Sequence, residues 1–474
     1  MKLKLLPILC CVIVLFTACK QDKEQDDNSA FFGGKIINPY SNFIILSKSR
    51  EIIDTIPLDK KNRFSYKIED VDAGLYHFFD GREVQTVLIQ PSDSLMLRLN
   101  TYDFDESLVY SGIGAKENNY LMNLFLLNEQ EETKILRLSQ SKPEKFEQEL
   151  NLLRDEKLAS LKKFKLKNTT TALFNVIAEA NINYKHYANK ELYPIANYSQ
   201  SEKIMFKSLP DNFYDYRKDI DYNSELLKDY TPYNSFMRFH INNLALQDHF
   251  KHSDDSTYDE LSLDFNLDKL KIIDEKISND YIKNRLLNYT MIRFINNSKI
   301  TENYNALFKS FKEKNTNKKD VARAEKLVNS YQRLKPGNKL PEVVVLNSED
   351  KELKLTSLIN KPTVIYFWTK HNKNHITTSH KRIKELNVKY PEVEFIAINV
   401  DSISYDTQKK VLNHFDVRIH NEYRLKSPRV AVKLLSVKPI NNVYIINKNY
   451  KIINAKANIF NISFEHELLG LINQ

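Results

Sequence analysis

The chain has 474 residues, which is enough for about three domains of ordinary size. Its 70 basic and 61 acidic residues give a formal charge of +9, but they are interleaved along the sequence, which is typical of a solvated surface and not of a clustered basic patch for nucleic acid. The 8 glycines form neither a GxGxxG nor a GxxxxGK[ST] motif, so no phosphate-binding loop is indicated, and we expect no cofactor and no nucleic acid.

The first residues have the pattern of an export signal. Lys2 and Lys4 precede the apolar stretch Leu5–Phe16, which is too short to span a bilayer as a mature helix. The next residues end at Cys19 and resemble the bacterial lipoprotein signal, in which the peptide is cleaved before the cysteine and the cysteine is diacylated. Phe16 departs from the Leu that this pattern prefers, and an ordinary secretory signal with a chance cysteine is the alternative.

The lipoprotein resemblance implies a protein of the cell envelope, held at a membrane through lipidated Cys19, on the periplasmic face or at the outer surface. The signal would be residues 1–18, and the charged and polar residues 19–30 would form a flexible tether. The other two cysteines, Cys10 and Cys11, would leave with the signal. The mature chain would then hold no free thiol, and its cores alone would stabilise it.

Residues 31–114 have the pattern of short strands separated by Asp, Gly, Pro and Ser, and this region holds six of the glycines. The pattern predicts an antiparallel β-sandwich or meander. Motifs such as Asn62-Arg63-Phe64 and Gln90-Pro91-Ser92-Asp93 resemble the small β domain of unknown function that precedes thioredoxin modules in envelope lipoproteins of Bacteroidetes. Strands are expected at Asn42–Leu46, Glu51–Leu58, Arg63–Ile68, Gly74–Phe79, Val84–Gln90 and Ser94–Leu99.

Residues 115–334 contain no glycine, and their apolar residues recur at helical spacing. One apolar stripe follows Pro143, a residue suited to the first turn of a helix, and Pro194, Pro210 and Pro232 punctuate the segment. The pattern predicts a helical domain, but it does not indicate what that domain does. Helices are expected around Phe146–Phe164, Leu173–Tyr187, Asn234–Lys251, Leu267–Ser278, Tyr281–Asn296 and Lys319–Leu334.

The most informative stretch of residues 335–474 is Lys361–His375, KPTVIYFWTKHNKNH. Thr363–Trp368 has the composition of a buried central strand, and a helical pattern runs from His375 to Tyr390. With Gly337-Asn338-Lys339-Leu340-Pro341 upstream and Val437-Lys438-Pro439 downstream, the region resembles the thioredoxin fold of TlpA and ResA-like envelope proteins, which implies a cis-proline at Pro439. Further elements are expected at Leu353–Leu358, Val393–Asp401, Tyr405–Phe415, Val430–Leu435, Val443–Ile446, Lys451–Asn454 and Phe464–Ile472.

In that family a CxxC motif begins the helix, and the resemblance places its two cysteines at Asn372 and His375. Thiol–disulfide exchange requires a thiolate that attacks a disulfide and a second thiol that resolves the mixed disulfide. A carboxamide is no nucleophile near neutral pH, and a histidine base without a nucleophile does not exchange disulfides. We therefore predict a domain that keeps the fold and has lost the redox reaction, so its degenerate site has no catalytic residue.

Three interpretations of this degenerate site stay open. In the first, Asn372 is a helix cap and His375 is an exposed residue of the first turn, with no function of their own. In the second, His371, His375 and His380 bind a metal or exchange protons, although no Cys, Asp or Glu is close in sequence and a helix amino end repels cations. In the third, an extended peptide pairs with the backbone before the cis-proline, in a groove formed by Trp368, His371, Asn372, Lys438 and Pro439 with His375 beside it.

The sequence thus predicts a multidomain α+β protein with an N-terminal antiparallel β domain, an α-helical middle domain and a C-terminal α/β thioredoxin fold. We expect no catalysis, and predict a module that binds an unknown envelope protein or peptide while Cys19 holds it at the membrane. A thiol–disulfide oxidoreductase, which family resemblance alone implies, is the alternative. A metal-dependent hydrolase is a third class and would require stoichiometric metal.

Overall fold

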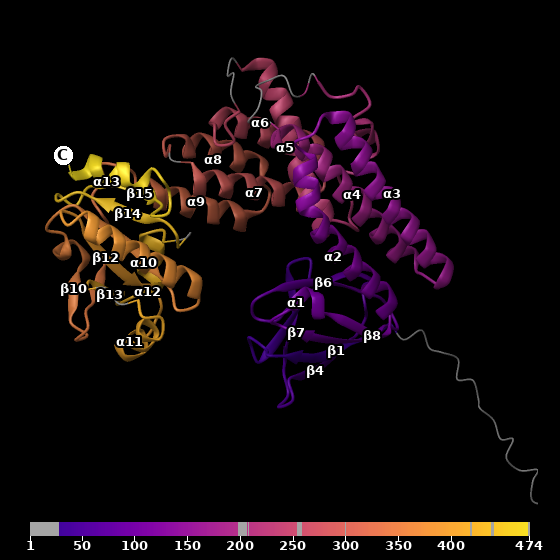
Figure 1. Cartoon of the computed structure of the whole chain (residues 1–474), viewed down its shortest axis with the longest axis horizontal. Coiled ribbons are helices and arrows are strands. Elements are labelled where there is room, and N and C mark those ends of the chain that lie inside the picture. Colours follow the sequence, from indigo (N-terminus) through magenta and orange to yellow (C-terminus); the bar gives the residue numbers. More distant parts are fainter. Residues whose placement is uncertain are drawn as a thin grey trace, which may run out of the picture. The chain divides into compact units, whose positions relative to one another are not determined.

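The computed structural model describes residues 28–197, 206, 208–253, 258–298, 300–417, 420–437 and 440–472. The chain is mixed α/β and divides into two compact units, which confirms the predicted multidomain fold class (Figure 1). The first unit comprises residues up to 220 together with 224–240, and the second comprises 221–223 and 241–474. The predicted signal, most of the tether and Cys19 lie outside the described residues.

The first unit begins with two four-stranded sheets, in the orders β4-β1-β7-β8 and β3-β2-β5-β6. All strand pairs are antiparallel except β1 and β7, which run parallel, so the predicted all-antiparallel pairing is wrong at this one place. A short helix, α1 (Phe104–Ser107), precedes the last strand. The strands are β1 (Ala30–Ile37), β2 (Phe43–Lys48), β3 (Glu51–Pro57), β4 (Arg63–Ile68), β5 (Gly74–Phe79), β6 (Val84–Ile89), β7 (Ser94–Asn100) and β8 (Val109–Ile113).

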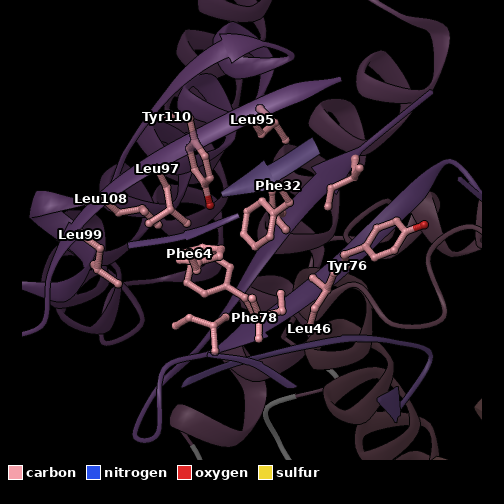
Figure 2. Close-up of a cluster of buried hydrophobic side chains, with 14 of the residues drawn as sticks. Phe32, Leu46, Phe64, Tyr76, Phe78, Leu95, Leu97, Leu99, Leu108 and Tyr110 are labelled. Carbon is pink, nitrogen blue, oxygen red and sulfur yellow. The ribbon is translucent and has the colours of Figure 1, made fainter. Parts of the chain in front are cut away.

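One hydrophobic core joins the two sheets, because alternate residues of each strand point inward. Figure 2 shows Phe32 beside Phe64 and Phe78, and the ring of Phe32 lies 5.4 Å from that of Phe64 and 5.7 Å from that of Phe78. Gly112 in β8 allows the strands to approach closely, since a Cβ there would lie 1.8 Å from the Ser94 carbonyl oxygen. The predicted sandwich is therefore the observed arrangement.

Three long helices follow in the first unit: α2 (Ala115–Leu138), α3 (Pro143–Lys167) and α4 (Ala172–Ala196). Pro143 occupies the first turn of α3, as predicted. Pro194 lies inside α4 and does not end it, so the expectation that it punctuates the segment is wrong. A short 3-10 helix, η2 (Asp215–Asp219), comes next, and the following helix α5 (Thr231–His252) runs from the first unit into the second.

In the second unit four helices precede a seven-stranded sheet: α6 (Leu263–Lys276), α7 (Asp280–Asn297), α8 (Asn303–Lys314) and α9 (Lys318–Arg333). Lys456 of the sheet contacts α7, α8 and α9. Its ammonium donates to the Ser298 carbonyl at 3.0 Å, contacts the Ile295 carbonyl and the Tyr304 hydroxyl, and lies over the Tyr331 ring. Burial lowers the pKa of Lys456 to about 7.

The helices of the predicted middle domain are divided between the two units, and the predicted domain boundaries stay a prediction.

The sheet of the second unit has the order β10-β9-β13-β12-β11-β14-β15, and β11 (Thr363–Trp368) is a central strand. It pairs parallel with β12 (Glu394–Asn399) and antiparallel with β14 (Val443–Ile446). The remaining elements of this domain are β9 (Val344–Leu346), β10 (Glu352–Lys354), η3 (Leu355–Leu358), α10 (Lys373–Lys389), α11 (Tyr405–His414), β13 (Glu422–Leu425), α12 (Pro428–Leu434), β15 (Ile452–Ala457) and α13 (Phe464–Ile472).

Helices cover both faces of this sheet. Val364, Tyr366 and Trp368 share one core with residues of α10, α11 and α13. Ile365 and Phe367 point to the other face and share a second core with residues of α12. The parallel β11–α10–β12 crossover beside an antiparallel β14–β15 hairpin is the arrangement of a thioredoxin fold. Among the described helices, none is both long and apolar enough to cross a membrane.

Candidate functional site

The candidate site lies where β11 ends and α10 begins. All six residues of β11 are buried, and Trp368 at its end has 0% exposed surface. The next residues form a short loop that Asp401 holds: Thr369 donates its hydroxyl to Oδ1 at 2.7 Å, and the backbone N–H of Lys370 donates to Oδ2 at 2.7 Å. Asp401 follows β12, so two adjacent parallel strands place these groups at one edge of the sheet.

Asn372 is the N-cap of α10. Its Oδ1 accepts a hydrogen bond from the backbone N–H of His375 at 3.1 Å, which satisfies one of the free donors of the first turn. This confirms the prediction that Asn372 caps the helix. Its side chain is exposed, as is that of His371 just before it.

His375 is buried with 9% of its surface exposed, so the expectation of an exposed first-turn residue is wrong. The helix places it on the face that packs against the sheet, and Ile376 beside it is buried too. Burial lowers the pKa of the His375 imidazole, and the nearby His380 lowers it further. Both effects favour the neutral form of His375.

A buried polar network lies next to His375, and the sequence did not reveal it. His380 has no exposed surface, and its Nε2 lies 3.0 Å from Oε1 of Glu422, while the Trp368 indole N–H donates to Oε2 of the same carboxyl at 3.3 Å. Tyr366 packs edge-to-face on the His380 ring, with ring centroids 5.2 Å apart. Glu422 is brought in by β13, a four-residue strand that the sequence pattern did not predict.

The hydrogen-bond partners of His380 restrict where its protons can lie. Nδ1 lies 2.8 Å from the Ile376 carbonyl oxygen, which can only accept, so Nδ1 carries a proton. Nε2 faces a carboxyl, so either the ring is doubly protonated or Glu422 carries a proton that it donates. His380 and Glu422 thus hold one proton between them, and neither nitrogen of His380 is free for a metal.

The structure brings together only some of the predicted site residues. Trp368 is fully buried, so its side chain cannot form the exposed wall of a groove, and the predicted groove is corrected on this point. His371 and His375 do not, among the described residues, join a third side chain in a group of converging metal ligands. Lys438 and Pro439 lie outside the described residues, and so does the cis peptide predicted at Pro439.

No protein-family model matches the chain, and no curated protein matches it either. Solved structures do. A thioredoxin-like protein from Bacteroides caccae is 13% identical, with 60% of this chain and 93% of that chain covered and a TM-score of 0.37. A candidate thiol-disulfide oxidoreductase from Bacteroides vulgatus is 18% identical over 29% of this chain and 98% of that chain, with a TM-score of 0.27.

A third solved structure, of a candidate thiol:disulfide interchange protein DsbE from Chlorobium tepidum, is 18% identical over 29% of this chain and 99% of that chain, with a TM-score of 0.26. The chain is thus similar over part of its length to thioredoxin-fold proteins. At these identities and TM-scores no residue role is carried over from them.

Proposed function

We propose that this chain is a cell-envelope lipoprotein whose thioredoxin-like domain binds a peptide or protein segment without redox chemistry. The observation that carries the proposal is the role of Asn372. At the position where the family resemblance expects the attacking thiolate, its carboxamide instead accepts the N–H of His375 at 3.1 Å and so completes the first turn of α10. The fold is retained, but a side chain that caps the helix occupies the position expected for the reactive sulfur.

The chemistry of the remaining groups supports the absence of exchange. All three cysteines of the sequence precede residue 20, so residues 20–474 contain no thiol that attacks or resolves a disulfide. His375 is buried, which favours its neutral form, and His380 and Glu422 are already paired with each other. A base and a buried proton without a nucleophile leave disulfide bonds unchanged.

The surface at the amino end of α10 supports binding. Exposed residues there are His371, Asn372, Lys373 and Asn374, and two hydrogen bonds to Asp401 support the preceding loop. Lysine side chains and the positive end of the helix dipole favour a negatively charged partner. The proposed ligand is therefore an extended, acidic peptide segment that pairs with backbone near Lys438 and Pro439.

Photo-crosslinking in native membranes tests the binding site. A photoreactive residue at Lys438 should capture a discrete partner protein, which mass spectrometry then identifies. The matched control places the same residue at Val388, which is 84% exposed near the opposite end of α10. Equal capture from both positions, or from neither, would contradict a site at the amino end of the helix.

An insulin-reduction assay tests the loss of redox chemistry and separates this proposal from the oxidoreductase alternative. The purified chain should show no reduction above background. The double variant N372C/H375C, which restores the CxxC spacing on the same helix, is the control that shows whether the assay detects activity in this scaffold. Reduction by the unaltered chain would refute the proposal.

Lipid anchoring at Cys19 is a separate part of the proposal. The Cys19→Ser variant should move from the membrane fraction to the soluble fraction, and mass spectrometry of the unaltered protein should find an acylated N-terminal cysteine. An uncut leader, or membrane attachment that survives Cys19→Ser, would contradict the anchor but leave the binding proposal standing.

A further inference from the structure

A second group of polar side chains lies far along the sequence from the α10 site, on two helices of the second unit. His249 and His252 are three residues apart near the end of α5, so the helical repeat places both on one face. Asp268 lies inside α6 and faces them. The ligand atoms of these three residues lie within 4.8 Å of one another.

The geometry of this group is that of a cation site. Nδ1 of His249 and Nε2 of His252 each lie 3.1 Å from the same oxygen, Oδ2 of Asp268. Two ligands bound to zinc at about 2.0–2.1 Å with a tetrahedral angle lie roughly 3.3–3.4 Å apart. The two N–O distances are a few tenths of an ångström shorter than this value, and all three ligand atoms lie within 4.8 Å of one another. A metal ion would therefore bind between side chains that are already close, in place of the two hydrogen bonds.

One side of the group is buried against α6, and the other side is exposed to solvent. The His249 side chain is only 4% exposed, and its ring packs edge-to-face on the buried Phe265 of α6, with centroids 5.9 Å apart. The His252 side chain is 51% exposed, which gives an ion a path from solvent and leaves space for water as a further ligand.

A purely structural role is the alternative for this group. The histidines would then only donate hydrogen bonds to the carboxylate of Asp268 and fasten α5 to α6. A carboxylate oxygen accepts two such bonds, so the hydrogen bonds by themselves do not separate the two roles. A metal is favoured because three ligand atoms from two helices lie within 4.8 Å of one another and because His252 is half exposed to solvent.

We propose that His249, His252 and Asp268 form a binding site for a divalent transition-metal ion, with Zn²⁺ as the expected occupant. Two imidazoles and one carboxylate suit zinc, whereas Mg²⁺ and Ca²⁺ prefer oxygen ligands alone. Three protein ligands leave at least one position for water, as in zinc sites that are not closed. The bound ion would also join α5 to α6 more firmly than the hydrogen bonds do.

Calorimetric titration of the full chain with ZnCl₂ tests the site, using protein that carries no histidine tag and has been treated with a chelator. The unaltered chain should bind one Zn²⁺. His252→Ala and Asp268→Asn should each weaken binding by at least the roughly tenfold to hundredfold that even an outer-shell change costs at zinc sites. Co²⁺ in place of Zn²⁺ should give the visible absorption of a four-coordinate ion, and both variants should lose it.

The chain has 11 histidines, so a matched control is needed. His414→Ala removes an exposed histidine near the end of α11 and should bind Zn²⁺ as the unaltered chain does. Circular dichroism checks that the variants are folded, and Asp268→Asn preserves the shape of the side chain. The site would be refuted if the unaltered chain bound no Zn²⁺, or if His252→Ala and Asp268→Asn bound it as tightly as His414→Ala does.

Discussion

Two places in the second unit combine two histidines with a carboxylate, and they differ in every property that matters for function. At α10, His380 is buried and Glu422 is partly buried, and both nitrogens of His380 already have partners. Between α5 and α6, the nitrogens of His249 and His252 converge on Asp268 beside solvent. The first arrangement, which we call the closed site, stabilises a core. The second, which we call the open site, is accessible to an ion.

The comparison shows that spacing along a helix does not by itself define a ligand set. His371, His375 and His380 lie close together in sequence, but His371 precedes the helix and is exposed, whereas the other two are buried on it. The carboxyl that meets His380 comes from a distant strand. His249 and His252 have an unremarkable spacing and become a candidate site only because α6 supplies Asp268. The direction in which the nitrogens point decides between the two outcomes.

The largest expected effect comes from breaking the closed pair. Glu422→Ala removes the partner of His380 and of the Trp368 indole and leaves buried polar groups without partners. We expect the free energy of unfolding to fall by about 3–5 kcal/mol. Trp368 is the only tryptophan of the chain, so its fluorescence during urea unfolding reports on this core directly.

The double variant H380F/E422L is the control for that experiment. It removes both hydrogen-bonding partners together and fills the space with apolar groups, so it should recover part of the stability lost in Glu422→Ala. A Glu422→Ala variant as stable as the unaltered chain would show that the pair contributes little and that the contrast with the open site is overstated.

The next effect concerns the pH dependence of the closed site. Burial lowers the pKa of His375 in the folded state, whereas in the unfolded chain this histidine is protonated below about pH 6.5. The unfolded state then binds more protons, so unfolding becomes easier as the pH falls below 6.5, by at most about 1.4 kcal/mol per pH unit. Urea unfolding followed by Trp368 fluorescence at pH 7.5 and pH 5.5 measures this.

His375→Phe should reduce that loss of stability between the two pH values. His371→Phe is the matched control, because His371 is exposed four residues earlier and should leave the pH dependence unchanged. If both variants behaved like the unaltered chain, the burial of His375 would not be linked to stability.

Much of this fold could be predicted from local sequence patterns, but most contacts within the two sites could not. β4, β5, β14 and α13 have the bounds that were predicted, because each is a run with a clear period or composition and a clear break at its ends. The Asn372 cap could also be predicted, since a cap depends on residues only three positions apart.

What could not be predicted depends on contacts between distant residues. β9 and β13 have three and four residues, too few to show a period, and they are strands only because neighbouring strands pair with them. The burial of His375, the His380–Glu422 pair and the meeting of His249 with Asp268 follow from how elements pack. No spacing of residues in the sequence predicts these contacts.

A smaller effect is expected at the exposed part of the α10 site. Asn372→Ala removes the acceptor of the His375 N–H, so α10 loses its cap and the free energy of unfolding should fall by about 1 kcal/mol. Asn372→Asp keeps an acceptor and places a negative charge at the amino end of the helix, so it should be as stable as the unaltered chain. Equal losses in both variants would contradict the capping role.

The smallest effect separates the open site from the closed one. Without metal, His252→Ala removes one hydrogen bond to Asp268 from a half-exposed side chain, so the cost should be about 0–1 kcal/mol. With excess Zn²⁺, the unaltered chain should gain thermal stability and His252→Ala should gain much less. The reason is that Zn²⁺ stabilises the folded state only when the site is intact and binds the ion tightly. A large loss in His252→Ala without metal, similar to that of Glu422→Ala, would mean that this group too is a closed structural pair.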